Sequence, residues 1–212
     1  MTQRARTILI VAVVAVVVIV AGVVAITFTS SGDDPDSASA TTVAAQLGKV
    51  TVTGEPLPQG EAPDDPDVGA KVPTISGADY TGKPVSIEPG TDGPMMIVVM
   101  AHWCPHCNAE VPKLVEWQQS GKVPAGLQVV GISTAVRGDA PNYPPSSWIA
   151  DTMKWPWPVI ADDEEQAAAT AVGTTGYPFV MFVDAKGSLM FRVAAELSID
   201  EIQQLADQAA AT

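Results

Sequence analysis

Residues 95–107 of the 212-residue chain read MMIVVMAHWCPHC, an apolar run that ends in two closely spaced cysteines. An uncharged run of this length is typical of a β-strand that is buried on both faces. Pro105 suits the first turn of a helix, and apolar residues then recur at helical spacing until Gly121. The two cysteines are therefore predicted at the junction between a buried strand and a helix.

The chain after this junction alternates predicted strands and helices. Residues 127–132 form a second apolar strand, and a strand, helix and strand in this order normally pair their strands in parallel. Residues 164–172 predict a helix, and residues 179–193 read as two strands around an Asp-Ala-Lys-Gly turn. Ser198 and Glu201 form the pattern of a capping box before a final helix. We therefore predict an α/β fold with a mixed sheet flanked by helices.

The regions around these elements are less regular. Three short stretches before the apolar run, residues 49–53, 72–75 and 85–87, have the pattern of strands. Residues 137–158 are dense in Pro and Trp and predict a loop that contains one short helix. The tryptophans of this loop either line a substrate groove or pack beneath the loop.

The N-terminus carries a candidate membrane segment. Residues 8–28 are apolar, Gly or Thr without any charge, which is about the length that crosses a bilayer core. Arg4 and Arg6 precede the segment and acidic residues follow it, which keeps the N-terminus cytoplasmic and exports the rest of the chain. A cleavable signal peptide is the alternative, but its apolar region is usually only about 7–15 residues long. We therefore expect an uncleaved signal-anchor and a single-pass protein of the cell membrane.

The sequence divides into four predicted parts. Residues 1–7 are the cytoplasmic N-terminus, and residues 8–28 are one transmembrane helix. Residues 29–70 are rich in small residues, Asp and Pro, which is the composition of an extracytoplasmic tether, with one possible short strand. Residues 71–212 form the folded domain.

The charge distribution excludes one class of partner. All 24 acidic residues follow the apolar segment, and the whole chain has a formal net charge of −13. Nucleic acid is a poor partner for such an acidic surface. The acidic residues are expected to keep the domain soluble, and the lipid bilayer is expected to contact residues 8–28 alone.

Cys104 and Cys107 are the only cysteines of the chain, and two residues separate them. A thiolate at a helix N-terminus is stabilised by unpaired backbone N–H groups, so Cys104 is expected to be the attacking sulfur. Cys107, one turn deeper, would then resolve the mixed disulfide. Pro105 and His106, which lie between the two cysteines, favour the thiolate of Cys104 and thereby make the Cys104–Cys107 disulfide more oxidising.

Two other uses of the cysteine pair are weaker. A zinc site needs four ligands, and both histidines of the chain lie beside the cysteines between residues 102 and 107, where they cannot surround one ion. A purely structural disulfide that closes so short a loop would add little stability. We therefore expect a redox-active disulfide, with no metal and no cofactor.

Further motifs point to a family. They are Trp-Cys-Pro-X-Cys at residues 103–107, Glu-Val-Pro at residues 110–112, Gly-Tyr-Pro at residues 176–178 and Val-Asp-Ala-Lys-Gly at residues 183–187. With these motifs, about two thirds of the chain resembles the thioredoxin-like domain of membrane-anchored thiol-disulfide oxidoreductases of the TlpA/ResA type. The Cys-Pro-His-Cys motif itself is similar to that of DsbA-like proteins.

The resemblance implies roles for the residues around the cysteines. Pro178 is implied to be a cis-proline packed against the disulfide, and Tyr177 before it to influence substrate preference. Glu110 is implied to tune proton transfer, and Val98 stands where thioredoxin itself has an aspartate. Trp103 is expected to shield the disulfide.

His102, in contrast to Trp103, is expected on the surface and without a catalytic role.

These features predict an extracytoplasmic thiol-disulfide oxidoreductase that exchanges disulfides with secreted or membrane proteins and is served by a membrane redox partner. The sequence leaves open whether the protein oxidises or reduces its substrates. The membrane segment and the overall pattern resemble the reducing branch of the family, whereas Pro105 and His106 match the oxidising DsbA-like proteins.

Two alternative functions fit the sequence less well. A thiol peroxidase of the peroxiredoxin class shares the fold but carries Pro and Thr or Ser before its reactive cysteine, where this chain has Ile97 and Ala101. Copper handling, as in Sco-like proteins, uses a wider cysteine spacing and a distant histidine, and no histidine follows His106.

Overall fold

The computed structural model describes residues 45–212. The predicted transmembrane helix, residues 8–28, lies outside the described residues, as do the predicted cytoplasmic N-terminus and the first part of the predicted tether. Among the helices within residues 45–212, none has the length and apolar character needed to cross a membrane.

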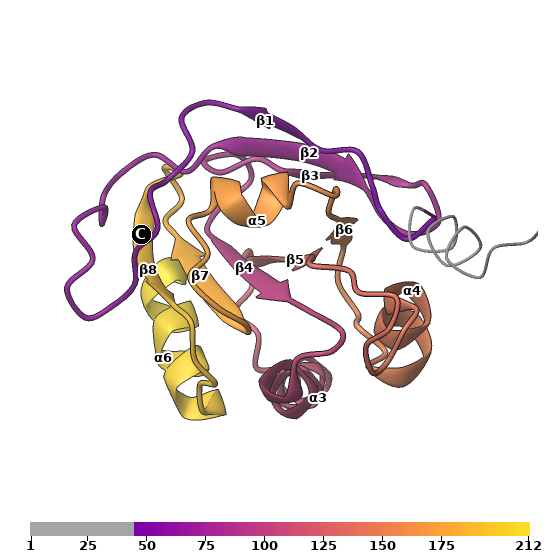
Figure 1. Ribbon diagram of the computed structural model, residues 1–212. Helices are drawn as coiled ribbons and strands as arrows, with labels where there is room; N and C mark the ends of the chain where they lie inside the picture. The colour runs from indigo at the N-terminus through magenta and orange to yellow at the C-terminus, as the bar shows by residue number, and fades with distance from the viewer. Residues whose placement is uncertain (1–44) are drawn as a thin grey trace, which may run out of the picture. The chain divides into compact units, whose positions relative to one another are not determined.

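A five-stranded mixed sheet forms the centre of the domain (Figure 1). Its strands are β4 (Met95–Met100), β5 (Gln128–Ser133), β6 (Val159–Ala161), β7 (Phe179–Val183) and β8 (Leu189–Val193). They lie in the order β6-β5-β4-β7-β8, with β4, β5 and β6 parallel, β7 antiparallel to β4, and β8 antiparallel to β7. The predicted mixed sheet of an α/β fold is confirmed.

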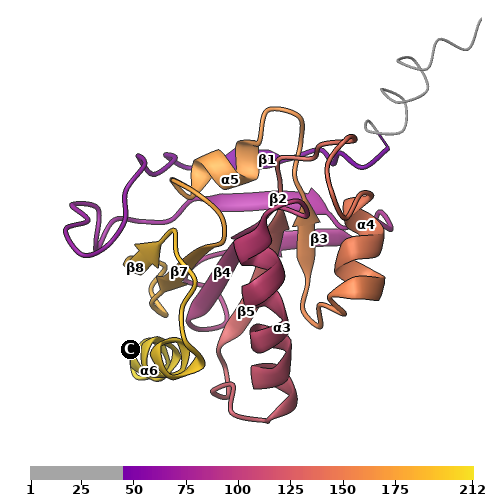
Figure 2. The ribbon, with the colours of Figure 1, turned by 60° about the horizontal axis from the view of Figure 1, so that its bottom comes forward.

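Two layers cover the sheet. Helices α3 (Pro105–Gln119) and α6 (Ile199–Ala210) lie on one face, as Figures 1 and 2 show. The other face carries α5 (Ala167–Ala171) and an antiparallel sheet of β1 (Thr51–Thr53), β2 (Thr74–Ala78) and β3 (Pro84–Ile87). The loop between β5 and β6 contains α4 (Pro145–Ser147) and a π-helical turn, η1 (Trp148–Thr152).

Strand β4 is the centre of both hydrophobic cores. Because side chains alternate along a strand, Met96, Val98 and Met100 contact the core under α3 and α6. The intervening residues pack against α5 and the three-stranded sheet. Every residue of β4 is buried, which explains the continuous apolar run in the sequence. The strand thus fixes the position at which the cysteine motif leaves the sheet.

Helix α5 is shorter than the sequence pattern predicts. The carboxylate of the buried Asp162 accepts the backbone N–H groups of Ala168 and Ala169 in the first turn of the helix. Gln166, immediately before α5, has a left-handed backbone conformation with φ 57°. Residues 163–166 therefore form a turn, and the predicted start near residue 164 is wrong.

The composition of the segment before β2 predicts a solvated tether, but the segment packs against the domain. Leu57 is buried in the core on the α5 side of the sheet. The fully buried guanidinium of Arg192 on β8 binds both Asp65 and Asp67, at 2.6 and 2.8 Å, and the carbonyl oxygen of Pro58 at 2.9 Å. These long-range contacts fix residues 57–67 to β8, the edge strand of the central sheet.

Candidate active site

Cys104 lies directly after the central strand and forms the N-cap of α3. Its carbonyl oxygen accepts the first helical hydrogen bond, from the N–H of Asn108 at 3.1 Å. The N–H groups of His106 and Cys107 come too early in the helix to have helical partners, so they favour a negative charge at this end. Cys104 is only 5% exposed. The strand and helix predicted from the sequence therefore place the thiol of Cys104 at the N-terminal end of α3.

The loop before β7 faces this thiol. The Cys104 thiol donates a hydrogen bond to the main-chain carbonyl oxygen of Tyr177 at 3.2 Å. The peptide bond between Tyr177 and Pro178 is cis, as the resemblance implies for this position. The main chain of Tyr177, next to the cis-proline, therefore lies directly beside the Cys104 thiol.

Cys107 is the deeper of the two thiols and is fully buried. Burial raises the pKa of the Cys107 thiol far above its usual range, and a charge on Cys104 or Glu110 raises it further. Cys107 therefore stays protonated while Cys104 reacts. Some group must take its proton before it can attack.

Glu110 is the candidate for that proton acceptor. It lies one turn after Cys107 on α3, and its side chain is fully buried. One carboxylate oxygen, Oε2, accepts the N–H of Leu197 at 3.1 Å, whereas Oε1 has no partner among the described residues. Burial raises the pKa of Glu110 to about 7. The carboxylate can therefore both bind and release a proton near neutral pH.

Replacing Glu110 with glutamine should slow the resolution step by about 100-fold, within the range of general acid–base effects. It should also remove from the pH–rate profile the inflection near pH 7 that the ionisation of Glu110 produces. Rapid-mixing experiments between pH 5 and 9 that monitor the release of the substrate from the mixed disulfide measure both the rate of resolution and the inflection. Glu116→Gln, on the exposed side of the same helix, is the matched control. An unchanged inflection in Glu110→Gln would contradict the role.

His106 points away from the protein core and is exposed. Its Nδ1 lies 2.7 Å from a carboxylate oxygen of Glu196, which Lys113 also contacts at 3.2 Å. The contact with His106, and to a smaller extent the contact with Lys113, holds the pKa of Glu196 below its usual range. Glu196 thus links the exposed side chains of His106 and Lys113.

Trp103 lies between the active site and the loop after β5. Its Nε1–H donates to the carbonyl oxygen of Ala135 at 2.7 Å, and its ring meets that of Tyr177 edge to face, with the centroids 6.0 Å apart. The guanidinium carbon of Arg137 stands 4.9 Å from the centroid of the Trp103 ring. Trp103 is half-buried and forms one wall of the site beside Tyr177.

His102 is fully buried, so its predicted surface position is wrong. Its Nδ1 lies 2.8 Å from the carbonyl oxygen of Pro141, and its Nε2 accepts the N–H of Arg137 at 3.2 Å. A neutral ring with the proton on Nδ1 satisfies both contacts. His102 therefore ties the strand end before the cysteines to the loop after β5, and burial lowers its pKa.

The lowered pKa predicts that the domain loses stability in mild acid. The unfolded chain protonates His102 near pH 6.5 whereas the folded chain resists, so stability is full above this pH and falls as the pH drops towards the folded value. His102→Gln retains one donor and one acceptor but cannot protonate, and should lose less stability between pH 7.5 and 5. Urea unfolding at several pH values measures this difference. Parallel pH dependences for the two proteins would rule out this account.

One important neighbour of the cysteines was missed by the sequence prediction. The amide nitrogen of Asn108 donates to the carbonyl oxygens of Cys104 and His102, at 2.7 and 3.2 Å. Its amide oxygen accepts from Nε1 of the buried Trp148 at 2.9 Å and from Asn142 at 3.2 Å. Asn108 therefore joins the motif to the loop that contains η1. No local pattern identifies this link, because Asn142 and Trp148 lie more than 30 residues away along the chain.

The described residues offer no alternative metal centre. Within residues 45–212, no three Cys, His, Asp or Glu side chains gather closely enough to hold an ion. The functional groups of the site are two thiols, one buried carboxylate and the loop at the cis-proline.

Comparisons with known proteins agree on the fold. The thioredoxin domain of a thiol-disulfide oxidoreductase from Bacteroides vulgatus superposes with a TM-score of 0.54 at 19% identity, over 68% of this chain and 97% of that domain. A thiol:disulfide interchange protein of the thioredoxin family from Chlorobium tepidum superposes with a TM-score of 0.54 at 24% identity, over 70% of this chain and 99% of its own. The predicted thioredoxin-like fold is thereby confirmed.

Sequence relatives carry a similar description. The thiol:disulfide interchange proteins DsbE of Haemophilus influenzae and Pasteurella multocida are each 27% identical, over 105 and 111 residues. In both cases the match covers 50% of this chain and 52% of the relative, so the chain spans about half the length of these relatives. The profile of the AhpC/TSA family matches residues 68–192, which are more than half of the chain and include both cysteines. The chain therefore belongs to the AhpC/TSA family, in agreement with the thioredoxin-like resemblance of its motifs.

Proposed function

We propose that this protein is an extracytoplasmic thiol-disulfide oxidoreductase that exchanges disulfides with secreted or membrane proteins. One observation carries the proposal: a thiol at a helix N-terminus, Cys104, faces the loop at the cis-proline while a second thiol, Cys107, lies buried one turn behind it. The names of the DsbE relatives and of the similar structures support the same activity.

The reaction proceeds in two exchanges. The Cys104 thiolate attacks a substrate disulfide, forms a mixed disulfide with one substrate sulfur and expels the other as a thiolate, which takes up a proton. Glu110 then accepts the proton of Cys107, and the Cys107 thiolate attacks Cys104 and expels the second substrate sulfur. Two electrons pass from the dithiol to the substrate, and the Cys104–Cys107 disulfide forms. The same steps in reverse oxidise a substrate dithiol.

The contact between His106 and Glu196 bears on the direction of exchange. A cation beside Cys104 stabilises the thiolate, and hence the reduced form, which makes a disulfide more oxidising. Glu196 lies 2.7 Å from His106 but also contacts Lys113, so its one negative charge cannot offset both cations. The predicted membrane segment and the overall motif pattern resemble the reducing branch of the family. We therefore favour the reducing direction, in which a membrane redox partner resupplies electrons to the cysteine pair.

The location outside the cytoplasm rests on the sequence of residues 8–28 and on the arginines before it. The test is labelling of the full-length chain in intact cells with a thiol reagent that does not cross membranes. Labelling of Cys104 before cell lysis is the expected result. Labelling only after lysis would place the domain on the cytoplasmic side.

The activity itself is tested by mixing the domain with two protein substrates. The reduced domain should reduce a disulfide-bonded protein, and the oxidised domain should oxidise an unfolded dithiol protein to a smaller extent at equilibrium. Alkylation followed by mass measurement reports the redox state of both partners. Consumption of a hydroperoxide without any exchange between the proteins would instead support a peroxidase.

A further inference from the structure

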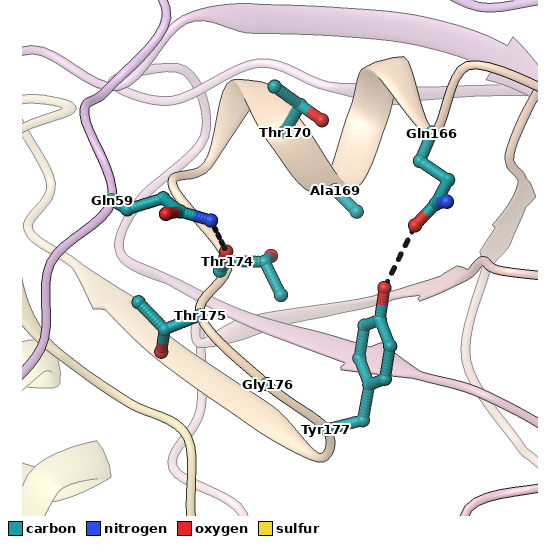
Figure 3. A pocket seen from close by; sticks show the side chains of 8 residues that line it. All are labelled: Gln59, Gln166, Ala169, Thr170, Thr174, Thr175, Gly176 and Tyr177. Carbon is teal, nitrogen blue, oxygen red and sulfur yellow. Dashed lines mark hydrogen bonds between the residues drawn. The ribbon is translucent and has the colours of Figure 1, made fainter.

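A pocket of about 230 Å³ opens beside Tyr177, on the side of α5 (Figure 3). Its walls come from the segment before β2, from α5 and the residue before it, and from the loop before β7. The polar side chains that line it are those of Gln59, Gln166, Thr170, Thr174, Thr175 and Tyr177. None of the residues that line the pocket carries a charge.

The pocket lies close to the reactive sulfur. Tyr177 is both a wall of the pocket and the residue whose main-chain oxygen lies 3.2 Å from the Sγ of Cys104. An extended chain advances only about 3.3–3.6 Å per residue. A polypeptide joined to Cys104 through a disulfide therefore has side chains within reach of the pocket, one or two residues from its own cysteine.

The walls of the pocket are held in place before any substrate arrives. Gln166 has a left-handed backbone, and its amide oxygen accepts the hydroxyl of Tyr177 at 3.0 Å, as Figure 3 shows. The amide nitrogen of Gln59 donates to the carbonyl oxygen of Thr174 at 3.1 Å, and the buried Arg192 holds the carbonyl oxygen of the preceding Pro58. Strained backbone that surrounding contacts maintain is common at functional sites, and pre-formed walls reduce the ordering cost of binding.

The hydrogen-bonding groups of the pocket are incompletely used. The Thr174 hydroxyl is buried from solvent and has no partner among the described residues. Gln59 and Gln166 each use one end of a carboxamide in the contacts above, which leaves the other end for a ligand. A charged side chain would find no opposite charge in the lining. Just beyond the lining, the carboxylate of Glu61 is held by the Thr175 hydroxyl and the Ala194 N–H.

We propose that this pocket is a substrate subsite that binds an uncharged, hydrogen-bonding side chain, that of Ser, Thr, Asn or Gln, next to the substrate cysteine. The proposal rests on the proposed function, because it assigns part of the substrate in that exchange. Binding there places the substrate sulfur beside Cys104 and selects among polypeptides by one neighbouring residue.

The test uses disulfide-linked homodimers of a short peptide with one cysteine, because attack on either sulfur then gives the same products. The reduced protein and a peptide dimer yield the Cys104–Cys107 disulfide and two peptide thiols. The residue on each side of the cysteine is varied in turn among Gln, Glu, Lys and Leu. At one of the two positions, kcat/KM for the Gln peptide should exceed those of the other three at least about fivefold.

A charge introduced into the pocket separates binding from general damage. Gln59→Glu should raise kcat/KM for the Lys peptide and lower it for the Glu peptide, opposite changes that partial unfolding cannot produce. Gln204→Glu, on the exposed surface of α6, adds the same charge elsewhere and should change neither.

Three results would overturn the proposal in distinguishable ways. Equal rates for all peptides, unchanged in Gln59→Glu, would remove the subsite and leave the proposed function intact. A wild-type preference for Lys or Leu would show that the pocket selects a different chemical class. Exchange with none of the peptides, while Cys104 still reacts with a small alkylating reagent, would overturn the proposed function and the subsite together.

Discussion

Cys107→Ser should accumulate as a covalent adduct with its protein substrate, because Cys104 can still attack but nothing resolves the mixed disulfide. Cys104→Ser should form no adduct, and its exchange rate should fall to that of the uncatalysed reaction, since Cys107 is fully buried and burial raises its pKa. Non-reducing electrophoresis followed by mass spectrometry detects the adduct. Stopped-flow exchange with a disulfide-bonded protein gives the rates.

The double variant Cys104→Ser/Cys107→Ser is the control, and it should neither form adducts nor exchange. The pair of single variants also separates the two roles. If Cys107→Ser turned over at the wild-type rate, or if adducts formed through Cys107 in Cys104→Ser, the assignment of nucleophile and resolving thiol would be wrong.

Asp65→Asn should destabilise the domain by about 1–3 kcal/mol, because the buried guanidinium of Arg192 loses one of the two carboxylates that it binds while Asp67 stays in place. The side chains of Arg192 and Asp65 are 0% and 2% exposed, and two hydrogen bonds of 2.6 and 2.9 Å join them. For a domain of this size the loss corresponds to a fall in Tm of about 2–12 °C. Urea unfolding and thermal melts measure the change. Asp64→Asn, at the exposed neighbouring position, should have an effect below about 0.5 kcal/mol.

The ion pair between Arg192 and Asp65 also predicts how the stability of the domain changes in acid. The hydrogen bond from Arg192 lowers the pKa of Asp65 below its usual value. Its contribution to stability is therefore fully present above the unfolded value near pH 4 and is lost as the pH falls through the folded value. Equal stabilities of Asp65→Asn and the wild type at neutral pH would show that the pair contributes nothing to holding residues 57–67.

The parts of the fold that a local pattern specifies were predicted from the sequence. The apolar run became β4, and Pro105 begins α3 as expected. Both hydrogen bonds of the capping box form at the start of α6, because Ser198 and Glu201 each accept the backbone N–H of the other with their side chain. In each case the determining residues are neighbours in the chain, so composition and spacing alone identify them.

The parts that were not predicted depend on contacts between distant residues. A Pro- and Asp-rich segment has the composition of a tether, yet Arg192 binds Asp65 across 127 positions of the chain. The short α5 depends on Asp162, whose acceptance of helix N–H groups no spacing rule specifies. Likewise, Gln166 comes to face Tyr177 only because a left-handed residue turns the chain there.

The most direct test of the account is a redox titration of the described domain in glutathione buffers, with acid quenching and alkylation. We expect Cys104 and Cys107 to change together in a single two-electron transition, with a potential nearer about −250 mV than about −120 mV. A value near −120 mV would reverse the direction of exchange proposed here. Separate titration of the two cysteines, with glutathione on Cys104 and Cys107 always a free thiol, would contradict the redox pair itself.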